Sequence, residues 1–106
     1  MNIIRIEEKD YDKEVIQNAG VTCVKFYAPW CGPCRMLSQV MEDIEDEKYN
    51  AIKVVEVNVD NAQNIARQLG VMSIPTMVFY VDGAVAETVV GFRNAPQLKQ
   101  LFDNYL

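Results

Sequence analysis

Apolar and polar residues follow two patterns along this chain. In some segments apolar residues run almost without a break, as in VTCVKFYA and IKVVEVNV, and in others they recur every third or fourth position. The first pattern is typical of buried strands and the second of amphipathic helices. We expect strands at residues 3–6, 21–28, 52–59, 76–81 and 84–90, and helices at about residues 10–20, 33–48, 61–69 and from 94 onward.

Turn and capping residues mark several boundaries of these elements. Asp10 can cap the first helix. Asp82-Gly83 suits a type I′ turn, so the last two strands should form an antiparallel hairpin. Asn94 and Gln97 resemble a capping box at the start of the last helix. The alternation of strands and helices predicts an α/β fold with a mixed sheet covered by helices, parallel in its early part and closed by the hairpin.

Length and charge narrow the class of protein. At 106 residues and 50% hydrophobic content, the chain can bury one modest core, so we expect residues 1–106 to form a single domain. No stretch approaches the roughly 20 uninterrupted apolar residues of a membrane span. The N-terminus reaches Arg5 without forming a cleavable apolar segment, which favours a cytoplasmic protein without a membrane contact. The excess of 15 acidic over 10 basic residues, with no basic run, argues against nucleic acid as a partner.

The chain has three cysteines and no histidine. An odd number of cysteines cannot pair completely within one chain, and disulfide frameworks are rare in a reducing compartment. Without histidine, a zinc site would need carboxylates beside the thiols, and a Ser-His-Asp or Cys-His catalytic unit cannot form. We therefore expect no metal site. Cys23, in the predicted central strand, should be a small buried hydrophobe, with a regulatory thiol as the alternative.

Cys31 and Cys34 lie where the predicted central strand gives way to a helix. Unpaired N–H groups and the macrodipole at a helix N-terminus favour an anion, so Cys31 should readily form the attacking thiolate. Cys34, three residues on, should lie about 5 Å away and be less exposed, as suits a resolving thiol. The loop that the two cysteines close is small, so their disulfide adds little stability and can open and close.

Three other interpretations of this pair are a zinc half-site, a structural disulfide and two packed thiols. The zinc half-site lacks its other half, while compartment and loop size disfavour a structural disulfide. Two packed thiols leave the flanking Trp30, Gly32 and Pro33 unexplained. A Cys-x-x-Cys sequence after a strand in an α/β pattern therefore favours a redox site.

Several longer motifs resemble those of the thioredoxin family, essentially from end to end. They are, in order, Val24 to Cys34 with Trp-Cys-Gly-Pro-Cys, Val57-Asn58-Val59-Asp60, Ile74-Pro75-Thr76, Asp82-Gly83, Val90-Gly91 and the amphipathic last helix. The resemblance implies a thioredoxin fold with a central mixed five-stranded sheet flanked by four helices. It also implies a cis peptide bond at Ile74-Pro75 that faces the cysteine pair.

The resemblance further implies a flat apolar surface around the cysteines, where extended substrate segments dock. Its members would be Trp30, Val71, Met72, Ile74, Pro75, Val90 and Gly91. For Val71 and Val90 alone, core packing is the simpler expectation, because most apolar residues need no functional explanation. For Pro75 alone, an ordinary proline at the start of a strand is the simpler expectation.

The activity that the resemblance implies is that of a general protein-disulfide reductase. It would work through a mixed disulfide and need no bound cofactor besides the Cys31–Cys34 disulfide. The implied partners are disulfide-containing proteins and a thioredoxin reductase linked to NADPH or ferredoxin. Gly32-Pro33 between the cysteines favours a reductant over an oxidant or isomerase of the same fold. A binding or regulatory module is a third interpretation, and nothing in the sequence demands more than a monomer.

Lys25 and Glu56 depart from the family pattern. Members usually carry a buried Asp on the central strand beneath the resolving cysteine and a Lys on the neighbouring strand, whereas this chain has the charges exchanged. The exchange keeps a buried pair neutral but moves the carboxylate. One hypothesis is that Glu56 takes the Cys34 proton during resolution while Lys25 favours thiolates. The alternative is a compensated structural pair, or two side chains that extend toward solvent.

Overall fold

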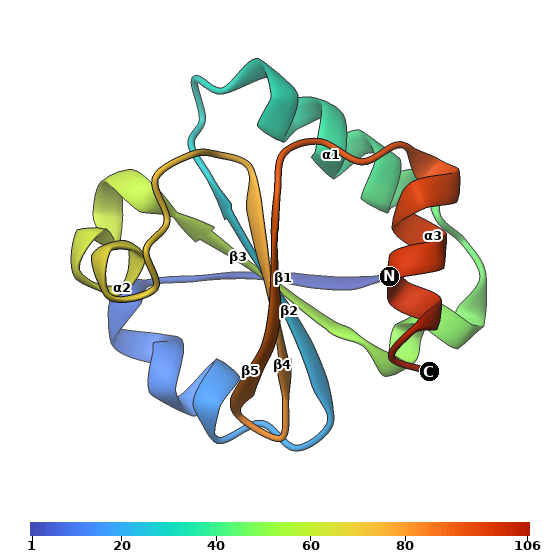
Figure 1. The fold of residues 1–106 in the computed structure, drawn as a ribbon, viewed down its shortest axis with the longest axis horizontal. Helices are drawn as coiled ribbons and strands as arrows, with labels where there is room; N and C mark the ends of the chain where they lie inside the picture. Colours follow the sequence, from blue (N-terminus) through green and yellow to red (C-terminus); the bar gives the residue numbers. More distant parts are fainter.

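The computed structural model describes all 106 residues of the chain, and a five-stranded sheet runs through its centre (Figure 1). The strands are β1 (Asn2–Ile6), β2 (Val21–Tyr27), β3 (Lys53–Asn58), β4 (Thr76–Val81) and β5 (Ala84–Val90). They lie in the order β1-β3-β2-β4-β5. β1 and β2 each pair with β3 in parallel, and β4 pairs antiparallel with both β2 and β5. The predicted mixed sheet is confirmed.

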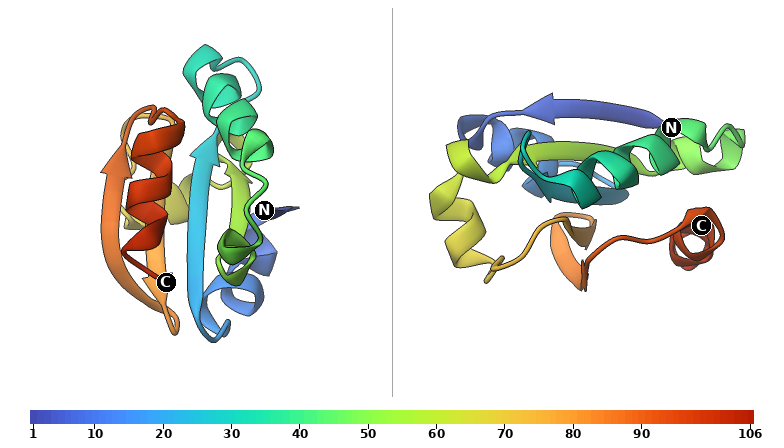
Figure 2. Two further views of the ribbon diagram at one scale, coloured as in Figure 1. Left: turned by 90° about the vertical axis from the view of Figure 1, so that its right-hand side faces the viewer. Right: turned by 90° about the horizontal axis from the view of Figure 1, so that it is seen from above.

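Helices cover both faces of this sheet. The α-helices are α1 (Gly32–Asp43), α2 (Gln63–Gln68) and α3 (Ala95–Asp103), and the first predicted helix is present as a 3₁₀ turn (Glu8–Asp10) followed by a π-helical turn (Asp12–Ile16). α1 and α3 lie on one face, while α2 and the first helical segment lie on the other (Figures 1 and 2). None of the helices has the length and apolar character needed to cross a bilayer.

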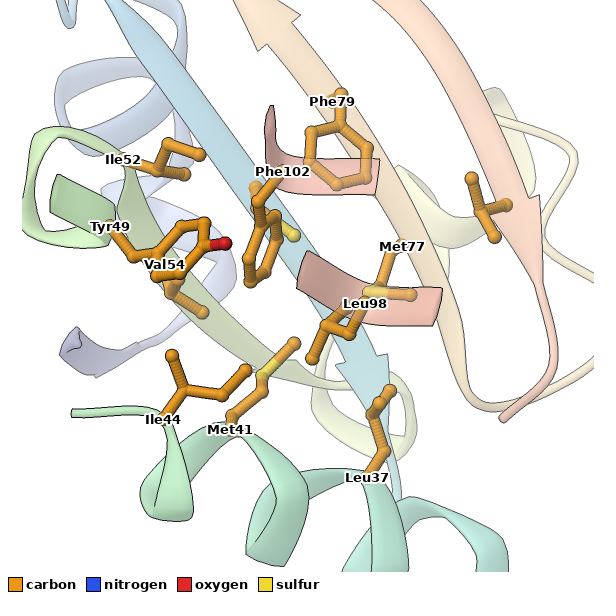
Figure 3. Packing of buried hydrophobic residues seen from close by; sticks show 12 residues of the cluster. Leu37, Met41, Ile44, Tyr49, Ile52, Val54, Met77, Phe79, Leu98 and Phe102 are labelled. Carbon is orange, nitrogen blue, oxygen red and sulfur yellow. The ribbon is translucent and has the colours of Figure 1, made fainter. Parts of the chain in front are cut away.

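The sheet contributes to two separate cores because successive side chains of a strand point to opposite faces. On the face of α1 and α3, a cluster of buried residues includes Cys23, Leu37, Met41, Val54, Met77, Phe79, Leu98 and Phe102 (Figure 3). On the other face, Tyr11 and Val15 pack with residues of β2, β3 and β4. Strands buried on both faces explain the nearly continuous apolar runs of the sequence.

The first helical segment begins earlier and winds differently than predicted. Glu7 occupies the N-cap position that the sequence assigned to Asp10, and the backbone N–H of Glu7 donates to a carboxylate oxygen of Asp10 at 3.3 Å. The prediction of Asp10 as the cap is therefore wrong, because the two carboxylates cap the turn reciprocally. The winding buries Tyr11 and Val15, and it brings the Tyr11 hydroxyl within 2.7 Å of the Tyr80 hydroxyl.

Helix α1 ends at Asp43, five residues before the predicted end at Lys48. Ile44 turns to an extended conformation, and its side chain is only 2% exposed in the core. Five of the six residues at 42–47 are acidic, and negative charge is unfavourable near the C-terminus of a helix. A separate 3₁₀ helix follows at Glu47–Ala51. Helix α2 likewise starts at Gln63 and not at residue 61, because a 3₁₀ turn at Val59–Asn61 precedes it.

The β4–β5 turn and the start of α3 agree with the sequence. Asp82 and Gly83 have φ angles of 50° and 81°, as the predicted type I′ turn requires. A Cβ atom at Gly83 would lie 2.1 Å from the Ile16 carbonyl oxygen, so the turn also needs glycine for space. The side chains and backbone N–H groups of Asn94 and Gln97 bond reciprocally at 3.0 Å, which confirms the capping box.

Candidate active site

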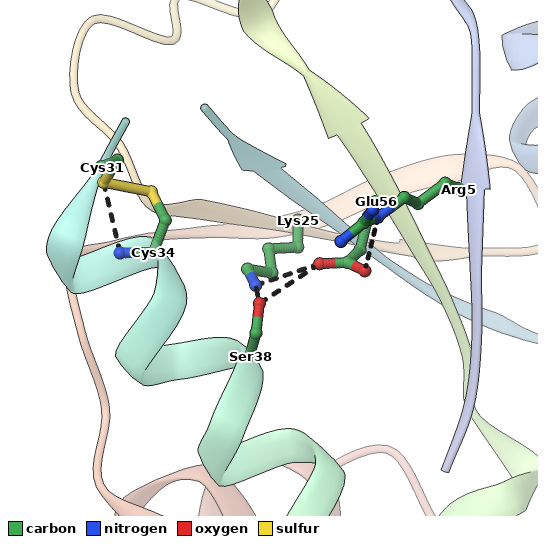
Figure 4. A network of polar contacts seen from close by, with 6 residues as sticks. All are labelled: Arg5, Lys25, Cys31, Cys34, Ser38 and Glu56. Atoms are coloured by element: carbon green, nitrogen blue, oxygen red, sulfur yellow. Dashed lines mark hydrogen bonds and ion pairs between the residues drawn. A yellow bond between two sulfur atoms is a disulfide. The ribbon is translucent and has the colours of Figure 1, made fainter. Parts of the chain in front are cut away.

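The cysteine pair lies between the end of β2 and the first turn of α1, as predicted. Cys31 and Cys34 form a disulfide with a Cα–Cα distance of 5.3 Å. Cys31 is the N-cap of α1, and its sulfur accepts a hydrogen bond from the backbone N–H of Cys34 at 3.2 Å (Figure 4). Pro33 stands in the first turn, where its missing N–H leaves no intrahelical bond unmade. The N-terminus of α1 is therefore directed at the Cys31 sulfur.

Both cysteines are buried, and Cys34 is the less exposed of the two. Cys31 is 5% exposed and Cys34 is 1% exposed, so the prediction of a more deeply placed Cys34 is confirmed. Trp30 beside them is 68% exposed, and its indole N–H donates to the Asp60 carboxylate at 3.1 Å. The Asp60 contact anchors one edge of the Trp30 ring and leaves most of its apolar surface in solvent.

Ile74-Pro75 faces the disulfide and is a cis peptide bond, as the family resemblance implied. The Ile74 carbonyl oxygen lies 3.9 Å from the Cys31 sulfur. The Pro75 carbonyl accepts a hydrogen bond from the Gly91 N–H at 2.8 Å, so the residue after β5 is held against the start of β4. Gly91 has a φ of 96°, a conformation that side-chain-bearing residues rarely adopt.

The structure brings the residues of the expected docking surface to one end of the sheet. Met72 is 96% exposed and Val90 is 55% exposed, so core packing is ruled out as the role of Val90. Val71 and Ile74 are partly buried against the core under α2. Exposed apolar side chains such as those of Met72 and Val90 suit contact with another chain when they form one patch.

Lys25 and Glu56 form a buried ion pair between β2 and β3, where they stand directly opposite each other in the sheet register. Lys25 is 0% exposed, and its Nζ lies 3.1 Å from Oε2 of Glu56. The alternative in which the two side chains extend toward solvent is therefore excluded, whereas a compensated structural pair and a catalytic pair both fit this geometry. Ser38 of α1 also takes part, since its hydroxyl accepts a hydrogen bond from Lys25 and lies 3.4 Å from Oε2 of Glu56 (Figure 4).

Arg5 completes this charged cluster of Arg5, Lys25, Ser38 and Glu56. Its Nε lies 3.6 Å from Oε1 of Glu56, and its guanidinium carbon lies 5.4 Å from the centre of the Tyr27 ring. The Arg5 side chain is 71% exposed, so it contacts the carboxylate from the solvent side. One carboxylate thus stands between two cations, and only Lys25 is removed from water.

A pocket of about 300 Å³ connects the charged cluster with the resolving cysteine. Its wall includes Cys34 and Ser38, which are four residues apart on α1 and therefore neighbours on one helix face. The pocket's other lining residues are Arg5, Tyr27, Ala28, Pro29, Arg35, Gln39 and Glu42. We call this space the Cys34 pocket.

Cys23 is fully buried in the core, at 0% exposure, as predicted for a small hydrophobe. Burial raises the pKa of its thiol, and the charge of nearby Lys25 offsets only part of that rise. A neutral thiol without access to solvent is a poor nucleophile. Cys23 therefore contributes packing and not exchange chemistry.

Sequence reasoning did not identify Arg5, Ser38 or Asp60 as parts of the site. Ser38 carried the clearest signal, because a polar residue four positions after Cys34 lies on the same face of the helix. Asp60 belongs to a motif of the family resemblance but carried no sign of its bond to Trp30. Arg5 reaches Glu56 only through the pairing of β1 with β3, which the sequence did not specify.

A disulfide that spans a single helical turn and starts at a helix N-terminus suits exchange with another disulfide far better than cross-linking. The site and the α/β fold thus define a thiol-disulfide oxidoreductase. Its redox-active group is the protein's own Cys31–Cys34 disulfide.

Comparisons with known proteins identify the family. The family model described as Thioredoxin matches residues 2–104. Thioredoxin of Bacillus subtilis is 39% identical over 106 residues, which cover 100% of both chains, and thioredoxin of Pyropia yezoensis is 37% identical over 106 residues, 100% of this chain and 99% of its own. "Thioredoxin M5, chloroplastic" of Oryza sativa is 36% identical over 104 residues, which cover 98% of this chain and 60% of the rice protein.

The chain therefore belongs to the thioredoxin family. Its fold is the thioredoxin fold, and its activity is that of a protein-disulfide reductase.

Proposed function

We propose that Cys31 attacks a disulfide of a target protein and that Cys34 resolves the mixed disulfide. The support is the position of Cys31 as the N-cap of α1, with the N–H of Cys34 directed at its sulfur at 3.2 Å. The Cys34 N–H and the N-terminus of α1 together favour a negative charge on Cys31. In the first step the Cys31 thiolate forms a bond to one target sulfur, and the other target sulfur leaves with the electron pair.

In the second step Cys34 loses its proton and its sulfur forms a bond to Cys31. The bond between Cys31 and the target sulfur breaks, and the target leaves as a second thiolate that takes a proton from solvent. The target is reduced by two electrons, and the pair Cys31 and Cys34 is oxidised by two. The Cα–Cα distance of 5.3 Å permits this closure without a backbone rearrangement.

Target segments dock, in this proposal, on the surface made by Trp30, Val71, Met72, Ile74, Pro75, Val90 and Gly91. Support comes from the high exposure of Trp30, Met72 and Val90 and from the 3.9 Å approach of the Ile74 carbonyl oxygen to the Cys31 sulfur. An extended segment beside Ile74-Pro75 would use backbone hydrogen bonds for affinity and the apolar surface for side chains. Such contacts depend on the extended shape of the target segment more than on its sequence, which suits a reductase with many targets.

Glu56 is the proposed acceptor of the Cys34 proton, and Lys25 the group that favours thiolates. The observation in support is the pocket of about 300 Å³ between Cys34 and the charged cluster. Glu56 is 7% exposed, so a proton placed on it is kept from bulk water. Glu56→Gln should slow the resolving step near neutral pH, and an unchanged pH–rate profile would remove Glu56 from the mechanism.

The oxidised protein is recharged, we propose, by a thioredoxin reductase linked to NADPH or ferredoxin, and it works as a monomer in the cytoplasm. The rice relative is named as chloroplastic, and fractionation of cells tests the compartment of this protein directly. The oligomeric state is tested by light scattering. Turnover of target disulfides with each reductase and its electron donor identifies the recharging enzyme.

The experiment that tests the proposed function is the equilibrium reduction potential of the Cys31–Cys34 pair, measured in glutathione and dithiothreitol buffers. A value clearly more reducing than the glutathione pool supports an electron donor to proteins. A value near that of disulfide isomerases contradicts it and indicates oxidation or isomerisation. Catalytic turnover of insulin disulfides at low protein concentration then separates an enzyme from a binding module.

A further inference from the structure

We infer that Ser38 is a positioning residue that passes the Cys34 proton from the Cys34 pocket to the Glu56 carboxylate. The inference rests on the proposed function, since it concerns the resolving step of the same exchange. It assigns a role to a hydroxyl that was not among the predicted site residues.

The hydrogen-bonding capacity of Ser38 gives the relay a direction. A hydroxyl offers one donor and two acceptor positions, whereas a lysine ammonium only donates. Lys25 occupies one acceptor position of Ser38, and Oε2 of Glu56 at 3.4 Å is placed to accept the Ser38 proton. The second acceptor position is left for a donor from the pocket, whose wall Ser38 shares with Cys34. Ser38 can therefore take a proton on one side and release its own on the other.

The Cys34 pocket is large and polar enough for this path to contain water. Its volume of about 300 Å³ exceeds by several-fold the roughly 30 Å³ that a water molecule occupies in the liquid. Polar side chains from β1 and α1 line it, so a water has the partners that it needs. Ser38 itself is only partly buried and faces this space.

The step balances in protons and electrons. The S–H bond of Cys34 breaks, its electron pair forms the bond to Cys31, and the pair of the former mixed disulfide leaves on the target sulfur. The proton moves through pocket water to the Ser38 oxygen, while the Ser38 hydroxyl proton moves to Oε2 of Glu56. No further oxidant or reductant is needed, and the departing target thiolate takes its proton from solvent.

Other charged groups near the pocket could compete with Glu56 for the Cys34 proton only if they can accept one. Arg5 and Arg35 cannot accept a proton, because a guanidinium has no acceptor position. Lys25, which faces Ser38 from β2, is likewise a donor in its charged form. Glu42 is the one carboxylate among the residues that line the pocket, whereas Glu56 is outside that lining and contacts it through Ser38. Glu42 makes no ion pair with the charged cluster. Glu42→Gln is therefore the matched control.

The test separates attack from resolution by stopped-flow with dithiobis-nitrobenzoate. The first release of thionitrobenzoate reports attack by Cys31 and depends on reagent concentration, whereas the second reports resolution by Cys34 and does not. Ser38→Ala should slow only the second release at acidic pH, by about tenfold. This loss is smaller than the ~100-fold minimum expected when a direct general acid or base is removed, because water in the pocket can still carry the proton to Glu56.

The pH dependence distinguishes a relay from a structural role. The deficit of Ser38→Ala should be largest well below the ordinary thiol pKa of about 8.5 and disappear well above it, where hydroxide removes the proton. Ser38→Thr keeps the hydroxyl and should restore the native profile. Glu42→Gln should leave both releases unchanged.

Three outcomes overturn the inference: native resolution in Ser38→Ala, a deficit that is equal at all pH values, or a deficit that Glu42→Gln reproduces. Each outcome is judged by comparison with the rate of the second thionitrobenzoate release in the native protein. If that second release is missing, or persists in Cys34→Ser, the proposed roles of the two cysteines have failed instead.

Discussion

The three cysteines of this chain occupy three different environments. Cys31 caps α1 and is in contact with the helix N-terminus, while Cys34 lines a polar pocket one turn later. Cys23 lies in the core between the sheet and the two helices α1 and α3, where burial raises the pKa of its thiol. The same side chain is therefore a nucleophile, a resolving group or a packing element according to its surroundings.

Alkylation of the reduced protein tests this assignment. Under native conditions an alkylating reagent should label Cys31 first and leave Cys23 unmodified, because the Cys23 thiol is neutral and has no exposed surface. In denaturant all three should react. Mass spectrometry counts the labels, and Cys31→Ser combined with Cys34→Ser serves as the control that should remain unlabelled in the native state. Rapid native labelling of Cys23 would contradict a purely structural role.

At the level of single residues, the sequence identified the chemistry but not its surroundings. Cys31 and Cys34 are close in the chain, so local helix geometry alone places their sulfurs together. Arg5, Ser38 and Glu56 come from three elements that meet only when the sheet order and the packing of α1 are known. Arg5 was missed because local patterns do not specify which strands pair. The position of Ser38 on the Cys34 face of α1 could be read from the sequence, but its contacts with Lys25 and Glu56 could not.

The ion pair between β2 and β3 is the main electrostatic feature at the level of elements. Lys25 is fully buried, and its charge is compensated by Glu56 at 3.1 Å. Removal of water from both groups costs about as much as their attraction returns, so the pair adds little net stability. A buried ion pair that adds little stability fits a role in proton transfer better than a role in holding the fold together.

Two variants separate stability from chemistry. Glu56→Gln leaves the Lys25 charge buried without a partner and should cost about 3–5 kcal/mol of unfolding free energy. The double variant Lys25→Met with Glu56→Leu removes both charges and should be about as stable as the native protein, or more stable. Urea unfolding measures both, and an equal loss in the two variants would contradict a compensated buried pair. In the stable double variant, resolution should still be slow at acidic pH and recover at alkaline pH, because no carboxylate remains at position 56 to take the Cys34 proton.

Secondary structure could be predicted where local and tertiary preferences agree. The strands and the hairpin turn followed from apolar runs and from Asp82-Gly83, and the start of α3 followed from its capping box. The predictions failed at the first helical segment and at the end of α1. In both places acidic side chains cap or end the helix locally, while apolar residues such as Ile44 turn toward the core. Apolar periodicity alone does not show whether a helix continues or ends where acidic side chains interrupt it.

At the scale of the whole molecule, one sheet holds the two cores together. Both faces of β2, β3 and β4 are buried, so neither core can be exposed without loss of the sheet. We therefore expect residues 1–106 to unfold in a single cooperative transition. The buried tyrosine pair Tyr11 and Tyr80 links the first helical segment to β4, with a hydroxyl–hydroxyl distance of 2.7 Å.

This tyrosine pair predicts a loss of stability in alkali. Burial raises the pKa of Tyr11, and the hydrogen bond to Tyr80 raises it further. The folded protein thus keeps a proton that the unfolded chain loses near pH 10. The contribution of Tyr11 to the free energy of unfolding is therefore constant below about pH 10. Above that pH it decreases, with a limiting slope of about 1.4 kcal/mol per pH unit.

Tyr11→Phe removes the titrating group, so its urea midpoint should fall less steeply above about pH 10 than that of the native protein. At neutral pH the variant should lose only about 1 kcal/mol, the usual worth of one hydrogen bond. Parallel alkaline curves for the two proteins would show that Tyr11 ionises as freely in the folded state as in the unfolded chain.

The measurement that tests the division of labour between the cysteines most directly is the trapping of a mixed disulfide with a target protein. Reduced Cys34→Ser should accumulate a stable covalent complex with insulin through Cys31, because no thiol remains to resolve it. Cys31→Ser should form none at the same pH and time. Mass spectrometry of the digested complex identifies the linked cysteine. A complex trapped through Cys34, or rapid turnover by Cys34→Ser, would contradict the assignment of Cys31 as the attacking group and Cys34 as the resolving thiol.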